Sequence, residues 1–482
     1  MSVPRPSVPD AIVIGSGPNG LAAAIALARA GRSVRVYEAA AVIGGATRSV
    51  ECTRPGFIHD VGAAVCALVP LSPFLRTLPL HEHGLALLSP DAPFAHPLDH
   101  RPAILVERSV EATAAQFTEP DARAYRALLE PWVSVAPQLM DALLAPFGIQ
   151  HPVLMAKFGR HAIRSLEGLA RGRFSDDAMW AMWAGVGAHS MVPLHHLATA
   201  GYALALLVSA HASGWPVAAG GSQQLANAMA AYLQSLGGEI VTNHRVASLA
   251  DLPPARAILC DVTPGQFRQL AAYGPTRRRV GASAARRLAR HRQGPGVFKL
   301  DWALHHPVPW RDRACCRAGT IHLGNSMHEI ATAERDVWAG RASAHPYVLA
   351  VQPSLFDASR APAGGHTFWA YCHVPNGSAV DMTDRMENQI ERYAPGFRDC
   401  IATRHTMFPA DLERANANLV GGDIAGGAAD LSQLIWRSAA RNPYATPLEH
   451  VYLCSSSTPP GVGVHGMCGF HAAQSALRHS FA

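Results

Sequence analysis

The sequence predicts an α/β protein in which a Rossmann-type parallel sheet binds a dinucleotide and is interrupted by an inserted α+β domain. Residues 11–14 form a short apolar run that leads into a glycine-rich turn, an alanine-rich helix pattern to residue 30 and a second strand at 33–37. Short apolar runs are again paired with glycines at 220–264 and at 440–482. The long stretches between these blocks carry alternating strand patterns and long helix patterns instead.

The glycine-rich turn has the form G-x-G-x-x-G, with Gly15, Gly17 and Gly20 at its fixed positions. The first glycine permits the tight turn, the second lets the backbone approach a pyrophosphate, and the third lets helix and strand pack closely. The following helix directs unpaired N–H groups and its positive dipole end at the phosphates. The second strand ends on Glu38, about 20 residues further on, where an acid accepts the ribose hydroxyls. The predicted contacts in this unit are Gly15, Ser16, Gly17, Pro18, Asn19, Gly20, Glu38 and Ala39, and the alternative is a glycine-rich turn in an ordinary α/β sheet.

A second double-glycine turn follows the acidic strand end, and it does not belong to the basic NAD pattern. Gly44 and Gly45 resemble the GG motif of the FAD-dependent amine oxidase and phytoene desaturase superfamily, and residues 54–63 are similar to its P-G-F-x-x-D-x-G segment. The resemblance implies FAD as the cofactor. It places Gly44, Gly45, Ala46, Thr47, Gly62 and Ala63 against the phosphates and the flavin edge. Many members carry Arg at the position of Ala46; Arg48 is the candidate substitute, with a surface arginine as the alternative.

Two later blocks complete the resemblance. Residues 220–249 resemble the family's G-G-x-x-x-L … G-G-E-I … V unit, in which the valine, here Val246, brackets the adenine. Residues 450–477 are similar to the closing segment of phytoene-desaturase-like proteins, whose last helix points at the pyrimidine side of the flavin. The resemblance therefore implies a glutathione-reductase-like FAD-binding fold with Ser456, Gly466 and Met467 at the flavin. The chain departs from this segment's pattern at Ser455, Ser457, Pro459 and Val462, which weakens the match to carotenoid desaturases proper.

The positions of these blocks predict two domains. Residues 1–100, 215–290 and 440–482 are predicted to form a discontinuous FAD-binding domain. Residues 100–215 and 290–440 are predicted to form the substrate-binding domain, with strands at 297–304 and 366–371 and a helical cap from 120–144 and 178–213. Ligand sites favour such domain interfaces, and the apolar residues of this part predict a cavity for a hydrophobic small molecule.

The composition and charge of the chain limit the partners, the compartment and the metal sites that are expected. The formal net charge is +6, and among 41 basic residues only Lys157 and Lys299 are lysines. Because the longest basic run is 277–279, no nucleic-acid partner is expected. The nine cysteines contain no C-x-x-C pair and no secretion signal is seen, so a reduced cytoplasmic compartment is expected. No spacing typical of a metal site was recognised, and the adjacent histidines 195–196 and 305–306 are expected to be structural.

No run reaches the roughly 18 apolar residues that a membrane-spanning helix needs. The basic, partly amphipathic stretch 156–173 is expected to be a solvated helix face. The alternative is a docking surface for a membrane or for an acidic protein that carries the substrate.

The resemblance implies an FAD-dependent oxidoreductase that desaturates a lipophilic isoprenoid, polyene or acyl-type substrate by hydride transfer to flavin N5. A redox-neutral isomerase, a saturase and an amine oxidase would share every motif, and a flavoprotein without turnover is the alternative of a different class. His465, just before the last helix, is the predicted catalytic residue, with His59 and His373 as further candidates. A hydrogen-bonding or packing role is the alternative for each histidine.

Overall fold

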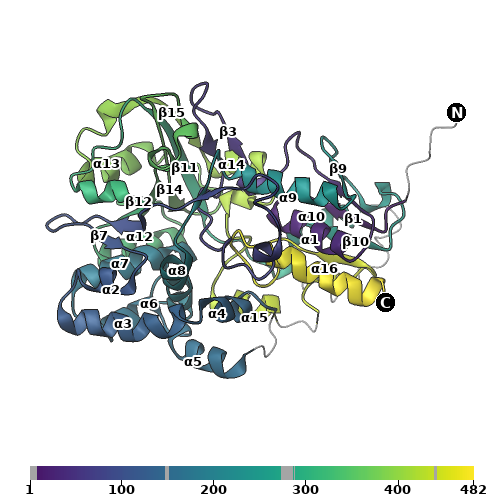
Figure 1. The fold of residues 1–482 in the computed structure, drawn as a ribbon, viewed down its shortest axis with the longest axis horizontal. Coiled ribbons are helices and arrows are strands. Elements are labelled where there is room, and N and C mark those ends of the chain that lie inside the picture. Colours follow the sequence, from purple (N-terminus) through teal and green to yellow (C-terminus); the bar gives the residue numbers. More distant parts are fainter. Residues whose placement is uncertain (1–7, 147–150, 273–285, 287, 439–441) are drawn as a thin grey trace.

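The structure of the protein, a computed structural model, describes residues 8–146, 151–272, 286, 288–438 and 442–482. Two large sheets dominate it (Figure 1). A five-stranded sheet lies at one end of the molecule with α1 and α16, and a seven-stranded sheet lies at the other end above a group of helices. The basic run 277–279 and the first seven residues lie outside the described residues.

The five-stranded sheet is parallel throughout, as the first βαβ unit predicts. Its order is β16-β10-β1-β2-β9. The strands are β1 (Ala11–Ile14), β2 (Val34–Tyr37), β9 (Glu239–Val241), β10 (Ala257–Cys260) and β16 (Val451–Leu453). Helices α1 (Pro18–Arg29), α9 (Gln223–Ser235) and α16 (Met467–Ser480) pack beside it. The contact between α1 and α16 is close, because a Cβ added to Gly469 would lie 1.8 Å from the Asn19 carbonyl oxygen.

The seven-stranded sheet has the order β15-β11-β14-β13-β12-β6-β7 and is antiparallel except between β6 and β12. Its strands are β6 (Ala92–His96), β7 (Ile104–Val106), β11 (Gly296–Leu304), β12 (Ala318–Leu323), β13 (Val348–Val351), β14 (His366–Val374) and β15 (Ile401–Met407). The strands predicted at 297–304 and 366–371 are therefore present as β11 and β14. One face of the sheet packs with α13 (Thr383–Tyr393) in an apolar core. β6, which precedes the domain boundary predicted at residue 100, belongs to this sheet.

The two long helices predicted for the cap are each divided. Residues 120–144 form α3 and α4 rather than one helix, because Pro137 has no N–H to continue the first of them. Residues 178–213 form α7 and α8, separated by a segment in which Met191 and Ala198 have positive φ and which contains Pro193. The helices of this group are α2 (Val110–Ala114), α3 (Glu119–Val133), α4 (Ala136–Leu143), α5 (Pro152–Ala162), α6 (Leu166–Arg171), α7 (Asp177–Gly187) and α8 (Thr199–Ser213).

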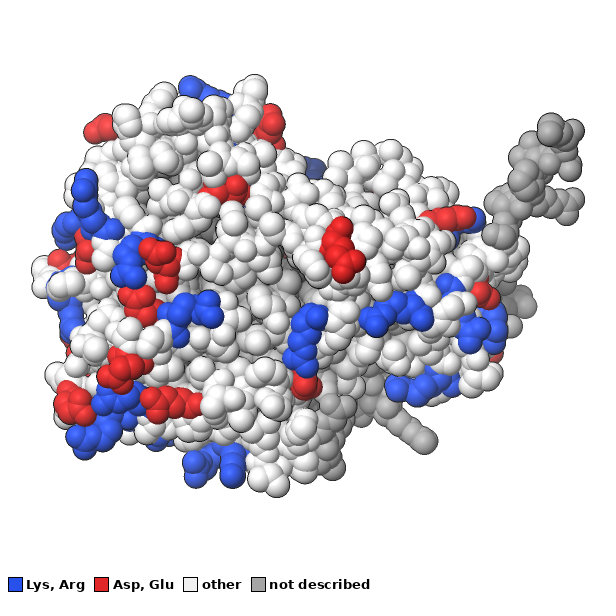
Figure 2. Space-filling model, viewed as in Figure 1, with Lys and Arg blue, Asp and Glu red and all other residues white. Residues whose placement is uncertain are grey.

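Short elements join these parts. The hairpin strands β3 (Ser49–Val50) and β4 (His59–Asp60) pair with each other, as do β5 (Leu87–Leu88) and β8 (Val217–Ala218). Among the described residues, further α-helices are α10 (Pro264–Leu270), α12 (Met327–Trp338), α14 (Pro409–Ala415) and α15 (Leu431–Ser438). On the face drawn in Figure 2, basic and acidic side chains are intermixed around α2 and α3, and wide areas carry neither charge.

Candidate active site

A cavity of about 1320 Å³ lies between the two large sheets. Its walls include residues that directly follow strands of the parallel sheet, namely Gly15 after β1, Glu38 after β2, Asp261 after β10 and Ser456 near the end of β16. Ligands of open α/β sheets bind outside these carboxyl ends of the strands. The volume exceeds the 300–1,000 Å³ that is usual for one small ligand, so the cavity has room for a dinucleotide and a second molecule.

The glycine-rich turn forms one wall of this cavity. Gly15 has a φ of +99°, which favours glycine, and a Cβ on Gly20 would lie 2.1 Å from the Gly15 carbonyl oxygen. Gly17 caps α1 without a side-chain hydrogen bond, and Pro18 follows it. The start of α1 therefore presents backbone to the cavity, as a pyrophosphate site requires.

Glu38 is held at the edge of the same turn. Its Oε2 accepts hydrogen bonds from the Ser16 N–H (2.9 Å) and hydroxyl (2.6 Å), and its Oε1 accepts from the Ala40 N–H (2.8 Å). His244 N–H donates to the Glu38 carbonyl oxygen at 2.8 Å, which brings Val246 to the cavity wall beside this carboxylate. The carboxylate is thus oriented toward one end of the cavity, where a ribose would need an acceptor.

We expect Glu38→Ala to weaken FAD binding about 10- to 100-fold, because hydrogen bonds to a charged acceptor contribute about 1.5–3 kcal/mol each. The FAD-to-protein ratio after gel filtration measures the effect. Glu239→Ala is the matched control, since that carboxylate is more than half exposed and pairs with Arg35. Equal FAD content in both variants would contradict the assignment of Glu38 to the ribose.

The double-glycine turn packs directly onto the first glycine turn. Gly44 and Gly45 have φ values of +110° and +54°, and the Gly44 N–H donates to the Ser16 carbonyl oxygen at 3.0 Å. A Cβ on Gly45 would lie 3.2 Å from the Gly17 Cα. Arg48 donates to the carbonyl oxygens of Gly45 and Ala415, so its guanidinium fixes the turn as well as lining the cavity.

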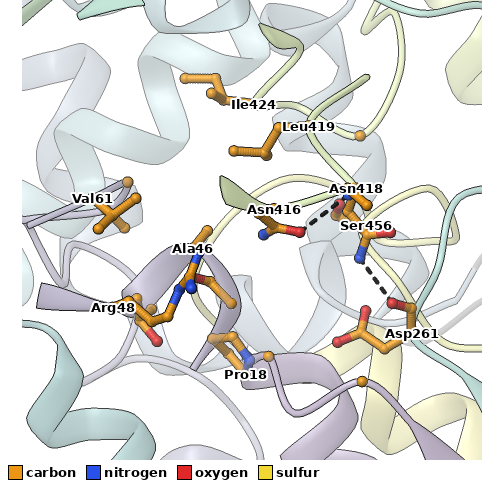
Figure 3. Close-up of a pocket in the computed structure, with 18 of the residues that line it drawn as sticks. Pro18, Ala46, Arg48, Val61, Asp261, Asn416, Asn418, Leu419, Ile424 and Ser456 are labelled. Atoms are coloured by element: carbon orange, nitrogen blue, oxygen red, sulfur yellow. Dashed lines mark hydrogen bonds between the residues drawn. The ribbon is translucent and has the colours of Figure 1, made fainter. Parts of the chain in front are cut away.

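The segment at 61–63 continues this wall. Ala63 N–H donates to the Ala46 carbonyl oxygen at 3.0 Å, and a Cβ on Gly62 would lie 2.5 Å from the same oxygen. Only a glycine allows this approach. Figure 3 shows Pro18, Ala46, Arg48 and Val61 on one side of the cavity and the loop with Asn416 on the other.

A buried carboxyl group that the sequence analysis did not single out lies beneath the glycine turn. Asp261 Oδ2 accepts the Gly20 N–H at 3.0 Å, and the Asp261 carbonyl oxygen accepts from Asn418 Nδ2 at 2.8 Å (Figure 3). Burial raises the pKa of Asp261 to about 7, against the lowering effect of the Gly20 bond. The signal for it was present, since Asp261 follows an apolar strand just as Glu38 does.

The raised pKa predicts a pH dependence. Between about pH 3.8 and 7 folded Asp261 holds a proton that the unfolded chain has released, so its contribution to the free energy of unfolding falls as pH rises through this window. Above about pH 7 the Asp261 carboxylate is ionised, and its negative charge then faces the site predicted for the pyrophosphate. We expect FAD affinity to fall several-fold from about pH 6 to about pH 8 in the wild type and to stay level in Asp261→Asn. Fluorescence titration with FAD measures this; an equal slope in both proteins would contradict it.

The opposite wall is one face of the seven-stranded sheet. Alternate residues of adjacent strands form rows across it: Lys299, Tyr371 and Leu349 are aligned, and Asp301, Trp369, Val351 and Thr320 form the next row. All of these except Asp301 line the cavity. The Lys299 ammonium group donates to Asp301 and lies 5.5 Å from the centre of the Trp369 ring. The sequence carries a usable signal for Lys299, because a lysine followed two residues later by Asp301 is unusual in an otherwise apolar strand.

The sequence pattern of the flavin containing amine oxidoreductase family matches residues 19–349. The chain belongs to this family. It is 28% identical to pyridine nucleotide-disulfide oxidoreductase domain-containing protein 2 of Mus musculus, over 97% of this chain and 93% of the mouse protein. It is 24% identical to a lycopene-forming phytoene desaturase of Paracoccus sp., over 97% of both chains. A solved structure of putrescine oxidase superposes with a TM-score of 0.61, at 18% identity and 98% coverage of both chains.

Membership in the flavin-containing amine oxidoreductase family makes the protein an FAD-dependent oxidoreductase, as predicted. The cavity fits the cofactor. At Gly20 and Gly62 an added Cβ would lie 2.1 and 2.5 Å from a carbonyl oxygen, and at Gly17 and Gly45 it would lie 3.0 and 3.2 Å from the nearest atom, so the turns around the cavity present closely packed backbone. Glu38 and the start of α1 supply a ribose acceptor and backbone donors. These residues would hold the adenosine and pyrophosphate of FAD.

Most of the predicted contacts lie on this cavity. The lining includes Gly15, Ser16, Gly17, Pro18, Asn19, Glu38, Ala39, Gly45, Ala46, Thr47, Gly62, Ala63, Val246 and Ser456. Gly20, Gly44, Gly466 and Met467 are not among the described lining residues. Gly20 and Gly44 shape the turns behind the wall. Gly466 has a φ of +68° and begins α16, where a Cβ would lie 3.0 Å from Ala22.

The catalytic role predicted for His465 is not retained. Its side chain is fully buried and is not among the described residues that line the cavity. Its Nδ1 accepts the Met467 N–H at 3.0 Å, and burial lowers the pKa of the ring to about 4. Because this bond satisfies one of the free N–H groups at the start of α16, His465 caps that helix.

The two other histidine candidates are also buried away from the lining. His373 Nδ1 lies 2.8 Å from a carboxylate oxygen of Glu334, and His59 Nε2 lies 2.8 Å from the Thr53 hydroxyl. Two of the described histidines do line the cavity: His244 lies beside Glu38 at the dinucleotide end, and His189 lies at the seven-stranded sheet, with its Nε2 3.0 Å from His322 Nε2. Burial lowers the pKa of His189 to about 3, so this ring is neutral. The sequence around His189 does not mark it as a cavity residue. Only the fold of the segment between α7 and α8 brings its ring to His322 on the sheet.

Proposed function

We propose that the protein is an FAD-dependent dehydrogenase that introduces a double bond into a lipophilic substrate, such as an isoprenoid, a polyene or an acyl chain. The observation that carries this proposal is the composition of the cavity beyond the dinucleotide motifs. The lining there is mainly apolar and aromatic: Val61, Leu68, Leu206, Trp215, Val297, Leu349, Val351, Trp369, Tyr371, Leu412, Leu419 and Ile424. Such a surface binds a hydrocarbon chain by excluding water from it.

The charges at the cavity favour a neutral substrate over a cationic amine. Among the described lining residues the carboxylates are Glu38 and Asp261, and both belong to the dinucleotide end. At the sheet the charged lining residue is Lys299, which is itself a cation. A substrate ammonium group would therefore meet no lining carboxylate there, because Asp301 lies behind Lys299 and is already paired with it. This argues against a diamine substrate, although the putrescine oxidase fold is similar.

Bound FAD supplies an acceptor for the hydride that leaves one carbon of the substrate. The chain's own residues exclude water, align the substrate on the sheet face, and receive the proton that leaves the neighbouring carbon. His189 is the described lining residue at the sheet whose neutral ring can accept that proton, and it would hold the proton only in passing, because burial lowers the pKa of this ring to about 3. The substrate thus loses a hydride and a proton, and a carbon–carbon double bond forms.

A purely structural flavoprotein would have its flavin face filled by side chains. Trp215 borders the cavity without filling it, and Met467 is not among the described lining residues. The part of the cavity that FAD would leave free therefore favours a protein that binds a substrate over a purely structural flavoprotein.

Anaerobic bleaching tests the proposal. FAD-loaded protein is mixed with a panel of isoprenoids, polyenes and long acyl chains, and separately with putrescine and cyclohexylamine. We expect bleaching of the flavin absorbance by a member of the lipophilic panel and none by the amines. Bleaching by an amine alone would replace the proposal by an amine oxidase. A flavin that only dithionite or a nicotinamide donor reduces would replace it by a saturase, an isomerase or a structural role.

Variants of one lining residue separate substrate access from flavin chemistry. Leu206 on α8 borders the cavity. Leu206→Trp should slow bleaching by a long substrate and leave reduction by dithionite unchanged. Leu206→Met, which conserves volume, should behave as the wild type. Equal slowing by both substitutions would place the substrate elsewhere.

We also propose that the surface around α5 contacts lipid, from which such a substrate would come. No described helix is long and apolar enough to cross a membrane. Val153, Ile163 and Leu197 are 67%, 49% and 56% exposed, and Lys157 and Arg160 are exposed beside them. Apolar side chains next to basic ones suit the surface of an anionic bilayer. We expect sedimentation with anionic vesicles, lost in the Val153→Glu, Ile163→Glu double variant; equal sedimentation of the variant would contradict this.

A further inference from the structure

A compact group of metal-ligand side chains lies outside the cavity lining. Cys52 and His59 come from the β3–β4 hairpin, and Asp301 comes from β11 of the seven-stranded sheet. The thiol, one imidazole nitrogen and one carboxylate oxygen all lie within 4.8 Å of one another. His59 and Asp301 are buried, and Cys52 is partly buried. Nearly 250 residues separate His59 from Asp301 in the chain, which is why their spacing gave no sign of a metal site.

Two of these ligand atoms make no hydrogen bond. His59 Nδ1 and Asp301 Oδ1 are buried and make no hydrogen bond, although they face each other at 3.6 Å. This separation is longer than the 2.7–3.2 Å of a hydrogen bond. It is close to the spacing of about 3.3–3.8 Å between ligand atoms of a tetrahedral zinc ion with bonds of about 2.0–2.3 Å.

Neighbouring side chains hold His59 and Asp301 in the way that the neighbours of metal ligands usually do. His59 Nε2 lies 2.8 Å from the Thr53 hydroxyl, and the Nε2–H tautomer that donates to it leaves Nδ1 with a free lone pair. Histidines that bind metals usually use the second ring nitrogen in this way. Asp301 Oδ2 is held by the Lys299 ammonium group, so Oδ1 is the oxygen that remains for a metal. His405 Nδ1, which also makes no hydrogen bond, lies 3.8 Å from Asp301 Oδ2 at the edge of the group.

We propose that Cys52, His59 and Asp301 bind one divalent transition-metal ion of the zinc class. Thiolate, imidazole and carboxylate together are ligands that Zn²⁺ accepts, with a water molecule or His405 completing the tetrahedron. On binding, the Cys52 thiol loses its proton to solvent and the sulfur–metal bond forms, with no change of oxidation state. The ion joins the β3–β4 hairpin to β11, two residues along the strand from Lys299 at the cavity. Its role is thus to fix the hairpin against the sheet wall of the active site.

Metal content and cobalt substitution test this proposal on the FAD-loaded full-length protein. The protein is freed of metal with a chelator, loaded with Zn²⁺ or Co²⁺ and desalted, and metal per FAD is measured by mass spectrometry. We expect about one ion per chain in the wild type. With Co²⁺ we expect the absorption bands of a tetrahedral, thiolate-bound ion at longer wavelengths than the flavin bands. Addition of Zn²⁺ to weakly buffered protein should release about one proton from the thiol.

Matched variants locate the ion. Cys52→Ser and His59→Gln should lose stoichiometric metal, whereas Cys316→Ser and His195→Gln, outside the group, should keep it. FAD content and melting temperature confirm that each variant folds, and the wild-type titration decides the question if one does not. Absence of metal uptake and of proton release by the wild type would overturn the proposal. So would stoichiometric metal in a folded Cys52→Ser, His59→Gln double variant, and Asp301 with Lys299 would then be an ordinary buried ion pair.

Discussion

Gly17→Val should abolish FAD binding while leaving a folded protein. A Cβ at this position would lie 3.0 Å from Asp261 Oδ2. The isopropyl group must therefore project between the start of α1 and Asp261, which both line the cavity. That space is the predicted pyrophosphate site, so the side chain and the phosphates exclude each other. The absorbance spectrum of the purified variant should lack the flavin bands.

The control separates loss of cofactor from loss of fold. Gly159→Val places the same side chain on α5, where an added Cβ would have nothing within 4 Å, and it should keep full FAD content. Gly17→Val should melt at the temperature of wild-type protein stripped of FAD, because a ligand stabilises only the state that binds it. A flavin spectrum of normal intensity from Gly17→Val would remove the pyrophosphate from this turn.

The dinucleotide unit could be predicted from sequence because its determinants are local. Gly15, Gly20 and Gly44 are each required by a positive φ or by a close approach within a few residues, and the adjoining strands are short apolar runs. Glu38 was found by its position at a strand end. Asp261 occupies the equivalent position after β10, yet no established motif marks it. Its importance depends on burial under a turn that lies about 240 residues away in the chain.

The sheet wall of the cavity could not be predicted in the same way. Whether Lys299, Trp369 and Leu349 share a face depends on the register of three strands, and long-range pairing leaves no trace in any one segment. His465 illustrates the converse error. Its place before the last helix can be read from the sequence, but side-chain direction decides access to the cavity, and the His465 ring turns back to the helix start.

Arg360→Met should be the most destabilising single substitution considered, with a loss of about 3–5 kcal/mol in the free energy of unfolding. The Arg360 side chain is fully buried, with Nη2 2.9 Å from Asp60 Oδ2 and Nε 3.1 Å from Asp357 Oδ2. Its Nη1 also donates to the Ile58 carbonyl oxygen at 3.3 Å. Methionine fills much of the space but leaves both carboxylates without their cation. Urea denaturation of the FAD-loaded protein measures the change.

The size of this loss in stability comes mainly from the two buried carboxylates that remain without a cation, rather than from the favourable energy of the ion pairs themselves. Asp60 Oδ1 keeps its bonds from the Ser49 hydroxyl and from the N–H and hydroxyl of Ser222, whereas Oδ2 loses the Arg360 guanidinium and gains no donor from methionine. Arg360→Lys should cost less than Arg360→Met, because lysine keeps the positive charge. It should still lower the free energy of unfolding, because lysine lacks the planar guanidinium group that reaches both carboxylates. Arg341→Met, at a largely exposed arginine paired with Asp336, should cost about 1 kcal/mol or less. A loss in Arg360→Met no larger than that of Arg341→Met would show that the two buried carboxylates find other partners or bind protons instead.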